Sequence, residues 1–189
     1  MVNKIVCIPL VILTFMLLLT NGVQAKNNTT EVSDSSAKIE ASASVAGLRQ
    51  SKEYILKKMV IKRVLKRYDS PLIEEVDAFV DACYVNNLDC YLVPSIAGLE
   101  STFGRRIAPN TYNPFGWGGG YIKFETWGDA IHTVAGGLRE NYIGRGAATV
   151  SDIGRVYAPP SSTWGGNVKK LMNTFEREEE KVTNIIEAL

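Results

Sequence analysis

The chain has 189 residues, of which 46% are hydrophobic and 22% are charged, and its formal net charge is +1 at pH 7. This length suits one domain with appended segments, and the composition is that of an ordinary globular protein. Because basic and acidic residues nearly cancel, the charge gives no support to nucleic-acid binding. The chain has three cysteines and a single histidine, His132, which lies far from them in sequence, so we expect no metal site. The function proposed below implies no cofactor either.

Residues 1–25 have the pattern of a secretory signal peptide. Lys4 gives a positive amino end, Ile5–Leu19 is an almost unbroken apolar run, and small or modest residues lead up to Ala25. The run is short for a membrane span, which needs about 20 residues. We therefore expect cleavage after Ala25 and a secreted or cell-envelope protein, with an uncleaved membrane anchor as the alternative.

Two segments precede the expected domain. Residues 26–48 are rich in Ser, Thr, Asn and Ala and contain no aromatic residue, which predicts a disordered linker. Residues 49–68 predict a basic amphipathic helix. Its basic side chains are either the solvated face of a packed helix or a surface that attracts an anionic wall polymer or a membrane. The expected apolar stripe of this helix consists of Ile55, Met59, Val60 and Leu65.

Ser70 and Pro71 predict the start of a second helix, with Ser as the cap and Pro at the first helical position. Cys83 and Cys90 flank the turn after this helix and are the only cysteines beyond the signal peptide. An exported protein favours a disulfide between them, and two separately buried thiols are the alternative. Inward positions are expected for Leu72, Val76, Phe79, Val80 and Cys83, and outward positions for Glu74, Glu75, Asp77 and Asp81.

Residues 91–127 combine an apolar helix that ends near Glu100 with a loop dense in aromatic residues and glycines. A carboxyl group in apolar surroundings can stay protonated at neutral pH and donate its proton. Aromatic rings stack on sugar faces, and amide groups bind sugar hydroxyls. The stretch therefore predicts a sugar-cleaving groove. The alternative is a solvated glutamate followed by aromatic residues of the core.

The remainder of the chain predicts further helices. The alternation in Gly120–Phe124 predicts at most a small β-hairpin beside the groove. Thr126 and Asp129 resemble a capping box at the start of one helix. Thr149 starts a shorter helix, and Trp164 starts the last segment, in which Val168, Leu171, Met172 and Phe175 are expected to face inward. The fold class is therefore mainly α.

The strings ESTFG and YNPFGWG, followed later by YAPP, are similar to strings in the lysozyme-like superfamily of peptidoglycan hydrolases. The resemblance covers residues 69–183 and is closest to endo-β-N-acetylglucosaminidase domains, with lytic transglycosylases as neighbours. It implies a lysozyme-like helical domain, with Glu100 as the general acid. The loop lacks the G-L-M-Q-like string of a transglycosylase, which favours the glucosaminidase side. The expected sugar-binding residues are Ser101, Tyr112, Asn113, Phe115, Trp117 and Tyr157.

The resemblance implies a monomeric enzyme that cleaves β-1,4 bonds between the N-acetylated amino sugars of peptidoglycan or a related glycan. A hydrolase usually needs a second carboxylate, whereas a lytic transglycosylase needs only the acid. Glu125 and Asp129 are the candidates for a second carboxylate, and assistance by the N-acetyl group of the substrate would remove the need for one. A lytic transglycosylase and a catalytically weak glycan-binding module remain alternatives.

Overall fold

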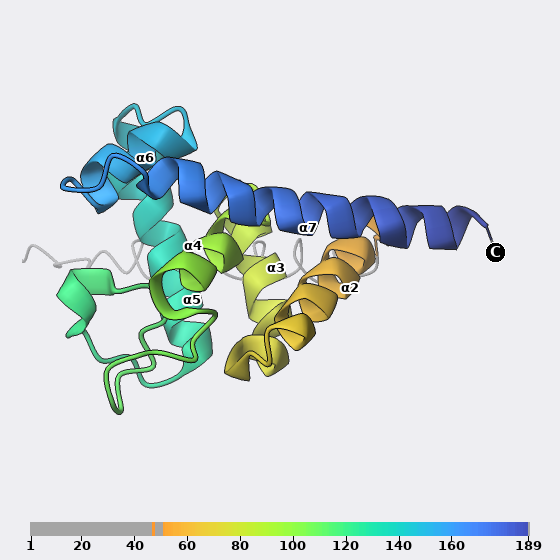
Figure 1. Cartoon of the computed structure of the whole chain (residues 1–189), viewed down its shortest axis with the longest axis horizontal. Helices are drawn as coiled ribbons and strands as arrows, with labels where there is room; N and C mark the ends of the chain where they lie inside the picture. Colours follow the sequence, from red (N-terminus) through yellow and green to blue (C-terminus); the bar gives the residue numbers. More distant parts are fainter. Residues whose placement is uncertain (1–46, 48–50, 189) are drawn as a thin grey trace, which may run out of the picture.

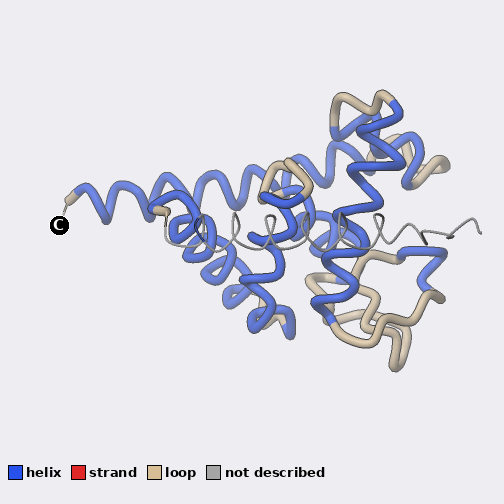
Figure 2. Tube along the Cα trace, turned by 180° about the vertical axis from the view of Figure 1, so that it is seen from behind, coloured by secondary structure: helices blue, strands red, loops and turns tan. Residues whose placement is uncertain are grey.

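The computed structural model describes residues 47 and 51–188, which fold into helices joined by loops (Figure 1). The described residues contain no strand (Figure 2), so the prediction of a mainly α fold is confirmed. The small β-hairpin that the sequence allowed at Gly120–Phe124 does not form. Directly before Tyr121 the chain makes a tight turn, η2 (Trp117–Gly120), in which Gly118, Gly119 and Gly120 have φ values of 62°, 71° and 84°. These left-handed conformations are incompatible with an extended strand.

The predicted signal peptide and most of the predicted linker lie outside the described residues. Among the described residues, no helix has both the length and the apolar character that crossing a membrane requires.

Helix α2 (Lys52–Arg67) begins at Ser51, whose hydroxyl accepts a hydrogen bond from the Tyr54 N–H. The predicted apolar stripe of this helix is only half right. Val60 and Leu65 are buried, but Ile55 and Met59 are 47% and 39% exposed. The helix packs against both α3 (Val76–Val85) and α7 (Trp164–Glu187), so its buried face is wide and lies on the side away from Ile55 and Met59. The buried residues of α2 are Tyr54, Val60, Ile61, Val64 and Leu65.

The second predicted helix begins as a 3₁₀ turn, η1 (Pro71–Glu75), and continues as α3 (Val76–Val85). The Ser70 hydroxyl caps it by accepting from the Leu72 N–H at 3.0 Å, as expected. All five residues predicted to face inward are buried. Asp81, predicted to face outward, is buried as well, and its carboxylate accepts a 2.7 Å hydrogen bond from the Tyr54 hydroxyl. A charged residue can occupy the core when a donor of this kind satisfies it.

A disulfide joins Cys83 to Cys90 with a Cα–Cα distance of 4.9 Å, which confirms the predicted pairing. It ties the end of α3 to the segment that leads into α4 (Leu92–Ser101). The Asp89 carboxylate accepts a hydrogen bond from the Tyr91 N–H at 2.8 Å and so helps to start α4.

Helix α5 (Trp127–Gly137) continues through a π turn, η3 (Leu138–Tyr142), and a 3₁₀ turn, η4 (Ile143–Arg145). The Thr126 hydroxyl caps α5 by accepting from the Asp129 N–H at 3.0 Å. Helix α6 (Val150–Tyr157) starts with a capping box between Thr149 and Asp152. These caps agree with the helix starts predicted from the sequence.

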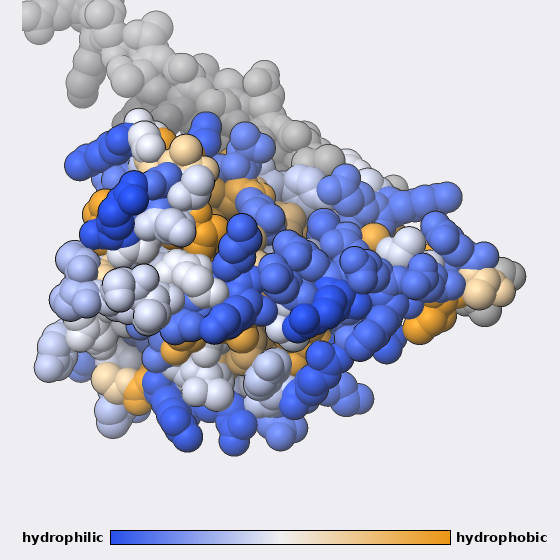
Figure 3. Space-filling view, turned by 45° about the horizontal axis from the view of Figure 1, so that its top comes forward, coloured by the Kyte–Doolittle hydropathy of each residue, from blue (hydrophilic) through white to orange (hydrophobic). Residues whose placement is uncertain are grey.

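Helix α7 (Trp164–Glu187) runs across the whole molecule, and its far end projects beyond the other helices (Figure 1). It packs on α2, α4 and α6 through a buried face that includes Val168, Met172 and Phe175. Hydrophilic side chains cover much of its outer face (Figure 3), and Ile185 and Ile186 near its end are about half exposed.

Residues 176–181 of α7 are charged, but not all of them face solvent. Glu178 is 2% exposed, and its carboxylate accepts hydrogen bonds from Arg63 and Arg67 of α2. Burial by itself raises the pKa of Glu178, but the hydrogen bonds and positive charges of the two arginines outweigh this effect, so the pKa lies below its ordinary value. Arg63 and Arg67 of α2 therefore bind α7 and are not merely a solvated face of the helix.

Candidate functional site

Glu100 lies in the last turn of α4, and its side chain is exposed. The sequence predicted an apolar floor around it. The apolar residues of α4 face the interior instead, while Glu100 points away from them. After α4, Thr102, Phe103 and Gly104 have positive φ values, and this reversal folds Phe103 back onto Gly98. A Cβ atom at Gly98 would lie 2.6 Å from the Phe103 ring, so the reversal needs glycine there.

The Glu100 carboxylate is held by Trp164, the first residue of α7. The indole Nε1–H of Trp164 donates a hydrogen bond of 2.6 Å to Oε1 of Glu100. The Trp164 side chain is buried, and its ring packs on Gly154 of α6, where a Cβ atom would come within 2.9 Å. The donor that orients the carboxylate is therefore itself fixed by packing.

Four aromatic rings lie next to this hydrogen bond. Trp164 stacks on Tyr157 with ring centroids 4.9 Å apart, and Tyr157 contacts Trp117 at 5.7 Å and Tyr142 at 6.0 Å. Trp117 and Tyr142 also contact each other at 6.1 Å. We call Trp117, Tyr142, Tyr157 and Trp164 the aromatic cluster. All except Trp164 are half-buried, so part of each of these rings faces solvent.

Tyr157 ties the loop before Trp117 to α6. Its hydroxyl donates a 2.5 Å hydrogen bond to the Phe115 carbonyl oxygen. Burial raises the pKa of Tyr157 far above its ordinary value, and the negative charge of Glu100 raises it further. Tyr157 therefore stays protonated and acts as a donor.

No protein-family model, curated protein or solved structure matches this chain. The geometry of the described residues is therefore the basis for assigning a function.

Three residues predicted to contact sugars are buried. The Ser101 hydroxyl lies 2.7 Å from the Pro114 carbonyl oxygen and accepts from the Gly104 N–H at 2.8 Å. The Asn113 amide nitrogen donates to the Trp117 and Ile122 carbonyl oxygens, and its oxygen accepts from the Trp117 N–H. The third, Phe115, is fully buried. These side chains hold the loop in shape, and the structure places them away from any surface that a sugar could contact.

The remaining predicted residues are on the surface. Tyr112 is 42% exposed and meets the edge of Trp127 at 5.2 Å, outside the aromatic cluster. Glu125 and Asp129 are exposed. Within the described part of the chain, no hydrogen bond or ion pair connects either carboxylate to Glu100 or to the aromatic cluster. The structure thus brings Trp117 and Tyr157 together beside Glu100 but does not join a second carboxylate to them.

Sequence reasoning missed two members of the aromatic cluster, Trp164 and Tyr142. Trp164 was expected only as the start of the last segment, and no site role was predicted for Tyr142. Within residues 47 and 51–188, no group of His, Cys, Asp and Glu side chains could hold a metal ion. The site that the structure describes is one exposed, oriented carboxyl group beside aromatic surfaces.

Proposed function

We propose that this protein cleaves β-1,4 glycosidic bonds between N-acetylated amino sugars, as in peptidoglycan, and that Glu100 is the proton donor. The observation that carries this proposal is the exposed Glu100 carboxylate, fixed by the buried Trp164 indole at the edge of the aromatic cluster. The resemblance of the ESTFG and YNPFGWG strings to lysozyme-like hydrolases supports the same assignment.

The two carboxylate oxygens of Glu100 have different surroundings. Oε1 accepts the hydrogen bond from the Trp164 indole, which can only donate. Oε2 faces Gly116, where a Cβ atom would lie 3.3 Å from it. Because glycine leaves this side open, Oε2 is the oxygen that carries the proton to the leaving glycosidic oxygen. A donor held in one orientation in this way avoids much of the entropic cost of aligning it for proton transfer.

The aromatic cluster provides the surface for the sugars. Trp117, Tyr142 and Tyr157 each expose part of a ring next to Glu100. Sugar rings stack on such faces through their C–H groups. Tyr112, which is exposed outside the aromatic cluster, would contact a more distant sugar.

The second step of the reaction needs no protein carboxylate in this proposal. As Glu100 protonates the leaving oxygen and the glycosidic bond breaks, the oxygen of the sugar's own N-acetyl group would attack the anomeric carbon, and water would then open the resulting oxazolinium ion. In the lytic route the sugar's own hydroxyl attacks instead and gives its proton to the Glu100 carboxylate. These two routes differ in product, because the lytic route leaves an anhydro end that is lighter by one water.

The decisive experiment compares wild type with Glu100→Gln on insoluble peptidoglycan, with mass spectrometry of the released fragments. Glutamine keeps the hydrogen bond from Trp164 but has no proton to transfer, so the rate should fall by about 10²- to 10⁴-fold while glycan binding is retained. Glu140→Gln, at an exposed position of η3, is the matched control and should keep the wild-type rate.

The same assay separates the alternatives. Full release by Glu100→Gln would remove Glu100 from the mechanism. Glycan binding by both proteins without release by either would establish a binding module instead. Loss of activity in Glu125→Gln or Asp129→Asn would identify a second catalytic carboxylate and contradict the single-acid route.

Export is also part of the proposal. The apolar run at residues 5–19 supports a cleaved signal peptide, so the mature protein should begin near Lys26. Amino-terminal sequencing of protein recovered from the native host tests this, and an intact Met1 would favour the uncleaved anchor.

A further inference from the structure

The outward face of α2 carries a row of lysines and apolar residues. Lys52, Ile55, Met59, Lys62 and Lys66 are all exposed, and we call them the α2 row. Their spacing of three and four residues places them along one side of the helix. The row is about 21 Å long. It lies opposite the buried face of α2 and is open to solvent.

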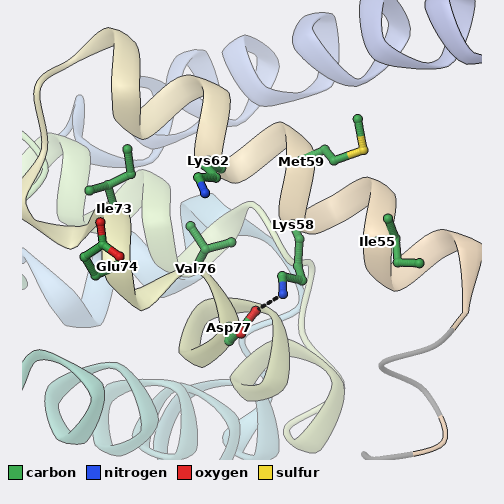
Figure 4. Close-up of a pocket in the computed structure, with 8 residues that line it drawn as sticks. All are labelled: Ile55, Lys58, Met59, Lys62, Ile73, Glu74, Val76 and Asp77. Carbon is green, nitrogen blue, oxygen red and sulfur yellow. Dashed lines mark ion pairs between the residues drawn. The ribbon is translucent and has the colours of Figure 1, made fainter.

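Basic residues on both flanks of the row are already paired. On one flank, Arg63 and Arg67 bind the buried carboxylate of Glu178. On the other flank, Lys58 forms an ion pair with Asp77 of α3 (Figure 4). These cations stabilise the packing of α2 on its neighbours, and the carboxylates of Glu178 and Asp77 offset part of their charge.

The lysines of the row itself are different. None of the ion pairs between described residues includes Lys52, Lys62 or Lys66. Glu74 of η1 lies near the row as an exposed acid, so the local charge remains positive. The α2 row therefore presents a net positive surface that the described part of the chain does not neutralise.

Between Lys52 and Lys62 the row is apolar. Ile55 and Met59 lie one turn apart and are 47% and 39% exposed. They border a hollow of about 340 Å³ between α2, η1 and α3, whose wall includes Ile73 and Val76 (Figure 4). Apolar side chains exposed side by side in this way gain free energy when a partner removes them from water.

We propose that the α2 row docks on an anionic phospholipid bilayer. Lysines extend to the lipid phosphates, while apolar side chains between them enter the boundary between headgroups and acyl chains. A soluble polyanion would pair with the lysines and leave Ile55 and Met59 in water, so it fits only half of the surface. This inference is independent of glycan cleavage and would hold the domain at a membrane face after the signal peptide is removed.

Vesicle co-sedimentation of the full chain tests the proposal. Binding is measured on phosphatidylcholine vesicles and on vesicles containing equal phosphatidylcholine and phosphatidylglycerol. Residues 1–25 are themselves apolar, so the quantity compared between proteins is the gain in affinity that phosphatidylglycerol produces. One variant carries Lys62→Gln with Lys66→Gln, and another carries Ile55→Ser with Met59→Ser.

Two matched controls come from α7. Lys169→Gln with Lys170→Gln removes two exposed lysines, and Ile185→Ser with Ile186→Ser removes two exposed apolar side chains. The wild type should bind vesicles that contain phosphatidylglycerol at least tenfold more tightly than vesicles of phosphatidylcholine alone. In each row variant this ratio of affinities should fall by about tenfold. The controls should remain within about twofold of the wild type, and added salt should weaken the lysine contribution.

Circular dichroism and the thermal midpoint confirm that each protein is folded, and a double variant that unfolds is replaced by Lys66→Gln or Met59→Ser alone. Row variants that gain as much affinity as wild type would overturn the proposal. It would also be overturned if polyphosphate competes fully with the vesicles and the Ile55→Ser, Met59→Ser variant binds unchanged, because the surface would then take a soluble polyanion.

Discussion

The indole of Trp164 donates to the carboxylate of Glu100 at 2.6 Å, joining the first turn of α7 to the last turn of α4. One partner is buried and the other is exposed. The buried ring cannot change position without disturbing its stack with Tyr157, so the orientation of Glu100 depends on the packing of α6 and α7.

Trp164→Phe tests this dependence. Phenylalanine keeps much of the stacking but has no N–H to donate. We expect kcat to fall by about tenfold to 10²-fold with little change in KM, because the loss is in donor alignment and not in sugar contact. The unfolding free energy should fall by only about 1 kcal/mol, since Glu100 regains water as a partner. Steady-state kinetics and urea unfolding measure the two effects.

Trp164→Ala is the comparison for that experiment. It removes the buried ring as well as the N–H and should cost about 3 to 5 kcal/mol of stability. If Trp164→Phe instead keeps the full wild-type kcat, the hydrogen bond has no role in positioning Glu100.

Gly137 provides a test of the aromatic cluster. A Cβ atom there would lie 2.8 Å from the Trp117 ring, so Gly137→Ala must displace Trp117. We expect lower activity and a loss of about 1 to 3 kcal/mol from overpacking. At the neighbouring Gly136, the nearest atom to an added Cβ is 3.8 Å away, on Asn86. Gly136→Ala should therefore leave activity unchanged and stabilise the helix by about 0.5 to 1 kcal/mol. Equal activity of the two variants would contradict the role of Trp117.

Glu178 predicts how stability changes with pH. Its pKa is lowered on folding, so its contribution is complete above the ordinary carboxyl pKa of the unfolded chain and is lost as pH falls through the lower folded value. At neutral pH, Glu178→Gln should cost about 1 to 3 kcal/mol. The unfolding free energies of the two proteins should converge as the pH falls below the lowered folded pKa of Glu178. Glu180→Gln, at an exposed neighbouring position, is the control, and a constant difference at all pH values would exclude the ionised pair as the cause.

The Cys83–Cys90 disulfide closes a short loop, for which the chain-entropy model gives a stabilisation of about 2.5 kcal/mol. The double variant Cys83→Ser, Cys90→Ser should unfold at correspondingly lower denaturant. Its activity at ambient temperature should persist, because the disulfide lies at the opposite end of α4 from Glu100. Thiol titration of the unreduced, denatured chain should detect Cys7 alone, or no thiol once the leader is removed. Two additional thiols would show that the bond is absent.

Helices and their caps were predictable because local signals determine them. Ser70, Thr126 and Thr149 each cap the helix that the sequence assigned to them. The inward residues of α3 were also found, since this helix has one apolar face. In α2 the prediction failed at Ile55 and Met59, because the helix contacts two neighbours and uses a wider face than the sequence stripe suggested.

The site was less predictable because its contacts join distant segments. Asn113 and Phe115 stand among aromatic and glycine residues that suggested a sugar-facing loop, but their environment is set by carbonyl groups and helices elsewhere in the chain. Trp164 follows Glu100 by more than sixty residues, and nothing local to either residue indicates that they meet. Glu178 lies in a run of charges and is buried only because two arginines of α2 reach it.

Helix α7 also sets a constraint on chain length. Trp164 meets Glu100 near one end of the helix, and Glu178 meets α2 about 21 Å further along the same rigid axis. Inserting or deleting one residue between them would rotate one anchor by about 100° relative to the other, so both could not be satisfied at once. Related sequences should therefore vary freely in residue type at the exposed positions of this interval, while the number of residues between the two anchors stays the same.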